Sequence, residues 1–509
     1  MGGKTADQGG TRETERKFEA PDRLDLSDPG SAFGLGVGRH DEVELDATYY
    51  DTEDLRLARA GLTLRRRVGG DDAGWHLKLP VDADTREEIR RPLGQQTRPP
   101  EALVALTRVY TRGARLDPVA KLVTRRRRWG LVDPQGEELA ELAEDRMHGI
   151  ALHPSPGELN WRELEVELTG PAPAGLLDSI EQELRSYGAR RSSAPSKLSR
   201  VLGDRLPARS GGSDEGKRRK LTSAQVVLGY VSEKVDVLRA HDPLVRLETP
   251  DAVHRMRVSA RRVRSILQGY RRVLDREATR ELVEDLRWLG GELAPARDAE
   301  VTSARFQEAV DALPPEVVLG PVSAELTRRF AREQAGGQRR AVAALDSDRY
   351  LLLQERLDAL LSEPPTTGAR STSSSRDLSR AVRKAHRRTA RRMETAAAAA
   401  PGHDRDGSLH EARKAAKRLR YVLEAAEPAL GKKAKRLRKR VKGVQSILGD
   451  HHDAVVARPV LRELGGRARL DGANGFTFGV LHGLEQDRAD RLEAEMVSAW
   501  ERVTLPAKL

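Results

Sequence analysis

The sequence predicts an α+β multidomain protein in which an antiparallel β barrel, or a strongly curved sheet, is followed by an all-α part. Three observations predict this architecture. In the first 200 residues, short runs of alternating polar and apolar residues are separated by Gly, Pro and Asp, which is typical of antiparallel strands joined by turns. From Leu221 onward the apolar residues recur at helical spacing, and this helical part contains an internal repeat.

The alternating runs define the strands of the first part. Several such strands in one domain favour a closed barrel or a strongly curved sheet. The six clearest runs are 12–18, 62–68, 75–79, 124–132, 139–147 and 161–168. We therefore place the first domain at 11–202.

Two polar segments organise the rest of the chain. Residues 203–220 include a run of small and polar residues without periodicity, which is typical of a linker. The helical domain follows at 221–505. A second polar segment, 363–375, divides it into repeats of about 221–362 and 376–505. Two such units are expected to be related by a pseudo-twofold axis.

The composition limits the partners more than it limits the fold. The 509 residues carry a net charge of +12, are 33% charged and only 4% aromatic, and include no cysteine. A positive excess raises the local concentration of polyanions, so nucleic acid, acidic membrane surfaces, nucleotides and inorganic polyphosphate are all candidates. Without cysteine there is no disulfide and no thiolate metal site. With no apolar run long enough for a signal peptide or a membrane span, we expect a cytoplasmic protein.

Each helical repeat contains one helix with a cationic face. A histidine is followed by basic residues three, seven, eight and ten positions later, so most of these side chains share one face, opposite an apolar one. The matching positions are His254, Arg257, Arg261, Arg262 and Arg264 in the first repeat, and His410, Arg413, Lys417, Arg418 and Arg420 in the second. We expect these helices to begin at Thr249-Pro250 and at Ser408.

A face of one charge sign repels itself, so its presence in two copies indicates an anionic ligand. Residues 410–442 hold 13 Lys or Arg against three Glu. A solvated basic surface is the alternative for any single run. Guanidinium groups bind phosphate oxygens bidentately. Few aromatic residues lie among the cations, which argues against base stacking on single strands but leaves binding to a duplex backbone open.

A second pattern, at 293–299 and 448–454, repeats about 40 residues after each basic helix. With these motifs, residues 221–505 resemble the CHAD domain, which is named for its histidines. The resemblance implies two four-helix bundles whose basic faces line a groove or pore that binds polyphosphate, and it assigns this binding to the ten positions above. The first copy has Ala294-Pro295 where the second has Gly449-Asp450, so the two sites need not be equivalent.

The strands of the first part pair an apolar face with a charged one. Glu13, Glu15 and Lys17 alternate along one strand, and Glu163 and Glu165 alternate along another, opposite leucine and valine. Neighbouring carboxylates repel one another unless a cation lies among them, and Mg²⁺ commonly bridges carboxylates to phosphates. For any single strand, an exposed charged face is the alternative.

The Glu13-x-Glu15-x-Lys17 motif near the N-terminus is similar to the start of the CYTH domain, the triphosphate tunnel fold of class IV adenylate cyclases and thiamine triphosphatases. Residues 62–67, Lys78, the Arg86–Glu88 pair, 161–168 and 196–200 add to this resemblance. Over 11–202 it implies an eight-stranded tunnel that binds a triphosphate with Mg²⁺ or Mn²⁺.

The resemblance and the strand parities together assign roles. The expected catalytic residues are Lys17, Glu13 and Glu15. The cations expected to bind phosphate are Lys17, Arg65, Arg67, Lys78, Arg86, Arg125, Lys197 and Arg200. The expected metal ligands are Glu13, Glu15, Glu141, Asp145, Glu163 and Glu165.

The sequence therefore predicts metal-dependent hydrolysis of inorganic triphosphate or short polyphosphate in the tunnel, with polyphosphate bound by the helical domain. The helical domain would hold a long chain near the tunnel or dock the protein on polyphosphate granules. Two alternatives stay open. One is a granule-associated protein that binds polyphosphate without turnover. The other is adenylate cyclase or thiamine triphosphatase activity, although few aromatic residues are available to recognise a base or thiamine.

Overall fold

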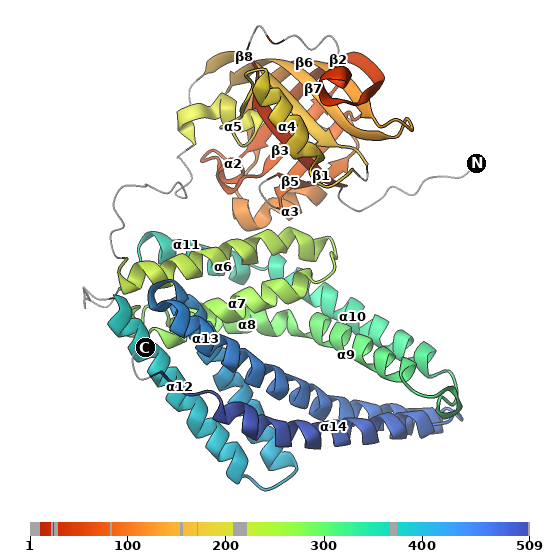
Figure 1. The fold of residues 1–509 in the computed structure, drawn as a ribbon, viewed down its shortest axis with the longest axis vertical. Coiled ribbons are helices and arrows are strands. Elements are labelled where there is room, and N and C mark those ends of the chain that lie inside the picture. Colours follow the sequence, from red (N-terminus) through yellow and green to blue (C-terminus); the bar gives the residue numbers. More distant parts are fainter. Residues whose placement is uncertain are drawn as a thin grey trace. The chain divides into compact units, whose positions relative to one another are not determined.

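The structure is a computed structural model that describes residues 11–21, 24, 29–81, 84–152, 156–170, 172–206, 221–366 and 374–506. Its contacts divide the chain into two units, Met1–Asp214 and Glu215–Leu509, and each is described by itself (Figure 1). Of the predicted linker 203–220, Gly203–Arg205 form a 3₁₀ turn, and 207–220 lie outside the described residues.

The first unit is a closed antiparallel barrel. Within the described residues, its sheet has the strand order β5-β4-β3-β2-β6-β7-β8-β1-β9, and pairing of β5 with β1 closes eight strands into a barrel. The strands are β1 (Thr11–Glu19), β2 (Gly36–Asp51), β3 (Thr63–Val68), β4 (Gly74–Pro80), β5 (Thr85–Arg91), β6 (Asp117–Val132), β7 (Glu138–Ala151), β8 (Gly157–Leu168) and β9 (Arg190–Arg191). The barrel prediction is confirmed. Five of the six alternating runs lie wholly within strands, and the run 62–68 begins one residue before β3.

The apolar faces of several strands lie on the outside of the barrel, where helices cover them. Phe18 of β1 and Leu164 and Val166 of β8 form a buried cluster with Ile180 and Leu184. The last two belong to α4 (Leu176–Ser186), which lies across the outer surface of these strands (Figure 1). Because side chains alternate along a strand, the charged residues between these apolar ones point inward.

A short helix carries one lysine into the barrel. Helix α5 (Lys197–Leu202) begins at Ser196, whose side chain and that of Ser199 form a reciprocal capping box. Leu198 and Val201 of α5 pack into a buried cluster with side chains of β6 and β7. This anchoring buries Lys197, the first residue of the helix. The remaining short helices are α1 (Pro29–Phe33), α2 (Arg56–Ala60) and α3 (Glu101–Thr111).

The second unit is all helical and has the predicted double arrangement. Its helices are α6 (Ser223–Arg246), α7 (Ala252–Gly269), α8 (Arg280–Glu292), α9 (Ala294–Asp311), α10 (Val322–Asp346), α11 (Asp348–Ser362), α12 (Ser374–Ala398), α13 (His403–Leu470) and α14 (Phe476–Glu501). Gly431, with φ 64°, divides α13 into two helices. Each half then consists of a first helix, a basic second helix, a long third segment (α8 with α9, or the end of α13) and a return helix (α10 or α14).

Both predicted starts of the basic helices are wrong. Helix α7 begins at Ala252, after Asp251 in a left-handed conformation, because the chain turns before the helix. Helix α13 begins at His403, so Ser408 lies within it rather than at its cap. The apolar faces are as expected, since Met256, Ala260 and Leu419 are fully buried. Among the described residues, no helix has both the length and the hydropathy needed to span a membrane.

Candidate functional site

The barrel encloses a cavity of about 870 Å³ that is lined mainly by charged side chains. The lining cations include Lys17, Arg65, Arg67, Lys78, Arg86, Arg90, Arg126, Arg128 and Lys197. The lining carboxylates include Glu13, Glu15, Glu88, Glu141, Glu165 and Glu167. Both charge signs therefore face the same space, and many of these charges form ion pairs with one another.

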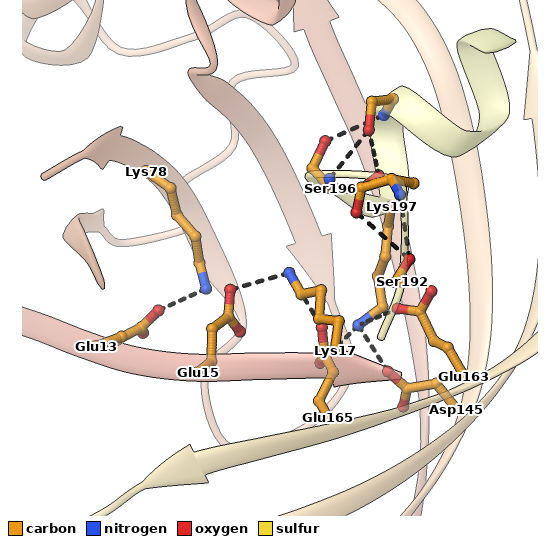
Figure 2. A network of polar contacts seen from close by, with 12 residues as sticks. Glu13, Glu15, Lys17, Lys78, Asp145, Glu163, Glu165, Ser192, Ser196 and Lys197 are labelled. Carbon is orange, nitrogen blue, oxygen red and sulfur yellow. Dashed lines mark hydrogen bonds and ion pairs between the residues drawn. The ribbon is translucent and has the colours of Figure 1, made fainter. Parts of the chain in front are cut away.

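Along β1 the inward Glu13 and Glu15 each contact a lysine (Figure 2). Lys78 Nζ donates to Glu13 Oε2 at 2.5 Å, Lys17 Nζ donates to Glu15 Oε1 at 2.9 Å, and Lys17 Nζ lies 3.3 Å from Glu165 Oε1. Burial opposes the charge of Lys17, but Glu15 and Glu165 outweigh it and raise the pKa of this lysine. Lys17 is thus held as a cation in the wall of the cavity.

Three buried carboxylates, Asp145, Glu163 and Glu165, converge beside these contacts. One oxygen from each lies within 4.8 Å of the others, and Lys197 Nζ lies 2.6 Å from Asp145, 3.4 Å from Glu163 and 2.7 Å from Glu165 (Figure 2). Arg126 also binds Asp145, at 2.7 Å. With the contact of Lys17 to Glu165, the cluster has three cationic partners among the described residues: Lys17, Arg126 and Lys197.

The donor set of this cluster fits a divalent metal ion. Hard cations prefer carboxylate oxygens, and the Oε1 atom of Glu163 is buried without a hydrogen bond among the described residues. Burial raises the pKa of Glu163, whereas at Glu165 the effect of burial is outweighed by Lys197 and Lys17, which hold its pKa well below the usual value. Within the described part of the chain, the Oε1 atom of Glu163 has only the ion pair with Lys197 Nζ at 3.4 Å, so an ion in place of Lys197 would give it a ligand bond.

Most of the residues predicted for the tunnel meet in this cavity. Those that line it are Glu13, Glu15, Lys17, Arg65, Arg67, Lys78, Arg86, Glu141, Glu165 and Lys197. Glu141 also lies 2.5 Å from Arg39, so an arginine already neutralises it. Asp145 and Glu163 join through their contacts with Lys197.

Two predicted phosphate-binding residues lie elsewhere. The placement of Arg125 in the tunnel is wrong: its side chain is 73% exposed and lies 3.9 Å from Glu44. Arg126 and Arg128 line the cavity instead, because inward and outward side chains alternate along β6. Arg200 does not line the cavity in this structure, since it binds Glu19 at 3.1 Å and lies over the Trp161 ring.

The cavity lining also includes residues that were not among the predicted site residues, among them Glu88, Arg90, Arg126, Arg128 and Glu167. Glu88 is buried and binds His76 at 3.0 Å. Burial, with a contribution from Glu13, raises the pKa of Glu167 to about 7. Glu88 lies two residues after Arg86 on β5, and Glu167 lies two residues after Glu165 on β8. Strand alternation is therefore the signal that could have identified both carboxylates.

In the helical unit, the two basic helices cross in direct contact. Tyr270 of α7 donates to the carbonyl of Val422 at 2.6 Å, and Arg261 Nε donates to the Tyr421 hydroxyl of α13 at 3.3 Å. Arg257, Arg261, Arg413 and Lys417 form what we call the central cluster, because each helix brings two of these cations to the crossing. Burial, followed by Arg413 and Arg261, lowers the pKa of Lys417 to about 7.

The second repeated pattern supplies one carboxylate to each half of this cluster. Asp298 lies 2.7 Å from Arg257, and Asp453 lies 3.5 Å from Arg413. These aspartates occupy matching positions in the two copies, so they explain why the pattern repeats with the basic helices. Two carboxylates for four cations still leave the crossing positively charged.

The histidines of the pattern are not a source of positive charge at the crossing. His410 Nδ1 lies 3.0 Å from His452 Nδ1. Burial and the neighbouring Arg413 lower the pKa of His452 to about 3, and burial also lowers the pKa of His410 and His254. At neutral pH the positive charge of the crossing therefore comes from arginine and lysine.

Comparison with known proteins agrees with both units. The CYTH domain model matches residues 11–202, and the CHAD domain model matches residues 229–462. The CYTH domain is the triphosphate tunnel fold, so the barrel and the helical unit define a two-domain protein of these two types. The chain is 37% identical over 508 residues to the Mycobacterium tuberculosis proteins MT2285 and Rv2226, with 96% of each chain covered. It belongs to this family, in which a CYTH domain precedes a CHAD domain.

Solved structures resemble each unit separately. PptA from Streptomyces chartreusis is 22% identical, with 55% of this chain and 100% of that chain covered and a TM-score of 0.47. The CHAD domain from Ricinus communis is 24% identical, with 56% and 93% covered and a TM-score of 0.45. HpAC1 from Hippeastrum, described as having a dominant triphosphatase activity, is 18% identical, with 37% and 94% covered and a TM-score of 0.25.

Proposed function

We propose that the CYTH domain hydrolyses inorganic triphosphate or short polyphosphate with the help of Mg²⁺ or Mn²⁺, and that the CHAD domain binds polyphosphate. The main support for this proposal is the composition of the cavity. Cationic side chains that could bind phosphate oxygens lie beside a cluster of three buried carboxylates. Phosphoryl transfer needs positioning and electrostatic stabilisation more than covalent chemistry, and this wall supplies both.

The cations of the cavity would hold the substrate. Arg65, Arg67 and Lys78 face the same space as Arg126 and Lys17, so they can contact oxygens of successive phosphates. Water would attack the terminal phosphorus, the bond from that phosphorus to its bridging oxygen would break, and pyrophosphate would leave. Lys17 would stabilise the developing charge, and Glu13 and Glu15 are the candidates for accepting the proton of the water.

The carboxylates Asp145, Glu163 and Glu165 would hold the metal ion, together with Glu13 and Glu15. When bound, a divalent ion neutralises phosphoryl oxygens and lowers the pKa of a coordinated water. Lys197 would then exchange its carboxylate partners for a phosphate oxygen, since it lies both at the carboxylates and in the cavity lining.

The lining favours an inorganic substrate over a nucleotide or thiamine triphosphate. Tyr49 is the one aromatic side chain among the described lining residues. It is buried beside Arg65 and is therefore already packed. A base or a thiazolium ring would find no stacking surface here.

The test is phosphate release from tripolyphosphate by the full chain with Mg²⁺ or Mn²⁺. Glu13→Ala should abolish release, whereas Arg125→Ala, a charge change on the outer surface of the same barrel, should leave it unchanged. ATP and thiamine triphosphate should be poor competitors. Failure to turn over tripolyphosphate with either metal would remove the enzymatic part of the proposal.

A second candidate, polyphosphate binding without turnover on polyphosphate granules, is favoured by one observation. Lys197 already fills the space between Asp145 and Glu165, so the carboxylates are balanced without a metal. In this case long-chain polyphosphate would bind, Arg413→Gln with Lys417→Gln would weaken binding, and no phosphate would be released. Duplex DNA should bind more weakly than polyphosphate at the same salt concentration.

A further inference from the structure

The two halves of the helix crossing carry different charges at equivalent positions. Because His254 matches His410, each residue of α7 corresponds to the residue 156 positions later in α13. The corresponding pairs are Arg262 and Arg418, Gln268 and Glu424, and Arg271 and Glu427. The second repeat therefore has two carboxylates where the first has an amide and a guanidinium group.

Corresponding residues make corresponding contacts in the two halves, but one contact is an ion pair and the other is not. Arg262 Nη1 lies 3.5 Å from the carboxylate of Glu424, and Arg418 Nη2 donates to the amide oxygen of Gln268 at 2.7 Å. Both contacts cross between α7 and α13. A carboxylate neutralises the first arginine, whereas a neutral amide leaves the second one charged.

The residues around each of these two contacts increase the difference in charge between the two halves. Glu427 lies 2.7 Å from Arg438, so Arg262, Glu424, Glu427 and Arg438 form a balanced group that we call the Glu424 face. On the other side, Arg264 of α7, Arg271 just after α7, Arg388 of α12 and Arg418 of α13 form the Arg418 patch. Burial, followed by Arg388, Arg271 and Arg264, lowers the pKa of Arg418 to about 10.

The Arg418 patch lacks neutralising partners. Among the residues that the structure describes, none of its four arginines forms an ion pair with a carboxylate, and Nε of Arg418 is buried without a hydrogen bond. Glu411 acts on Arg418 only at longer range, and it binds Lys414 at 2.7 Å. Arg264 is also repelled by Arg261 of the central cluster, so the patch continues the positive surface of the crossing.

We propose that a polyphosphate chain held by the central cluster continues onto the Arg418 patch and not onto the Glu424 face. This inference rests on the proposed binding of polyphosphate by the CHAD domain. Each phosphate of the chain carries a negative charge, so it is attracted by free guanidinium groups and repelled by Glu424 and Glu427. The CHAD domain thereby selects chains that are long enough to leave the central cluster, and it directs them to one side.

The experiment measures the affinity of full-length protein for long-chain polyphosphate over a series of salt concentrations. Arg271→Gln with Arg388→Gln should weaken binding about tenfold and reduce the slope of log affinity against log salt by about two. Both side chains are exposed, so the fold should tolerate the change. Arg280→Gln with Arg491→Gln removes the same charge from exposed sites elsewhere in the domain and is the matched control, with little expected effect.

The opposite change tests the other side. Glu424→Gln with Glu427→Gln removes both carboxylates of the Glu424 face and should tighten binding, because Arg262 and Arg438 lose their ion-pair partners. If the Arg271/Arg388 variant behaves like the control while Arg413→Gln with Lys417→Gln abolishes binding, the directional inference is wrong and the proposed function stands. If long-chain polyphosphate does not bind the unmodified protein, the proposed function itself fails. Equal weakening of duplex DNA binding by the Arg271/Arg388 change would show a general polyanion surface and overturn the assignment to polyphosphate.

Discussion

The barrel cavity and the helix crossing both concentrate cations, but they do so under opposite electrostatic conditions. In the barrel, neighbouring carboxylates outweigh burial and raise the pKa of Lys17 and Lys197. At the crossing, burial and neighbouring arginines lower the pKa of Lys417 to about 7. The cavity is thus neutralised from within and suits chemistry that needs a metal and cations together, whereas the crossing needs an external anion for its balance.

The largest expected effect is the loss of turnover when one oxygen donor of the carboxylate cluster is removed. Glu163→Gln keeps the shape of a side chain that is almost fully buried but removes its charge. We expect kcat/KM for tripolyphosphate to fall about 10²–10³-fold, as when one electrostatic stabilising group is lost elsewhere, with polyphosphate binding unchanged. Unchanged turnover would separate this cluster from the reaction.

Removing a lysine from each region should change stability in opposite directions. Lys197→Met leaves Asp145, Glu163 and Glu165 with less compensation in a buried site, so the free energy of unfolding should fall by about 3–5 kcal/mol. Denaturant unfolding without metal is the measurement. Saturating Mg²⁺ should restore part of the loss if the carboxylates bind the ion. A fully stable Lys197→Met protein without metal would contradict the balance inferred for the cavity.

Lys417→Met is the matched change at the crossing. Here the substitution removes a buried ammonium group that lies near Arg413, Arg261 and Arg257, so the free energy of unfolding should rise by on the order of 1 kcal/mol. Affinity for long-chain polyphosphate should fall about tenfold in the same variant, because a charge-assisted contact is lost. A variant that is both less stable and weaker in binding would indicate a structural role for Lys417.

Much of the cavity could be predicted because charged and apolar residues alternate strictly on β1 and β8. Leu164 and Val166 pack on the outside of the barrel. The side chains of the glutamates that alternate with them therefore point inward. The same rule, applied to β6, would have avoided the wrong placement of Arg125. Trp129 and Leu131 belong to the outer buried cluster, so the even-numbered Arg126 and Arg128 must face the cavity. Residues 125–128 are all arginine, so this run taken alone does not show which side chains point inward.

The long strand β2 and the charge asymmetry of the crossing are harder to predict. On β2 the apolar Val43, Leu45 and Tyr49 line the cavity, which reverses the pattern of β8, so no single rule for inward charge holds around the barrel. The pairing of Arg262 with Glu424, and of Arg418 with Gln268, depends on how two helices cross. The repeat showed which residues correspond, but not which ones touch.

The smallest expected effect is a pH dependence that belongs to the crossing alone. Lys417 has a pKa of about 7 in the free protein, and bound phosphate would raise it. Below pH 7 both free and bound proteins are protonated, so affinity is constant. Above pH 7 the free protein loses the proton that the complex retains, so affinity for polyphosphate should fall roughly eightfold between pH 6.5 and 8.

Lys417→Arg is the sharpest control for this effect, because guanidinium stays charged throughout and the matching residue of the first repeat is already Arg261. This variant should bind at pH 6.5 about as well as the unmodified protein and should keep its affinity at pH 8. In the free protein the pKa of His452 is lowered to about 3 and that of His410 is also lowered, in both cases mainly by burial. If Lys417→Arg shows the same decline as the unmodified protein, a group other than Lys417 titrates, and the contrast between a self-neutralised cavity and an unbalanced crossing loses its main support.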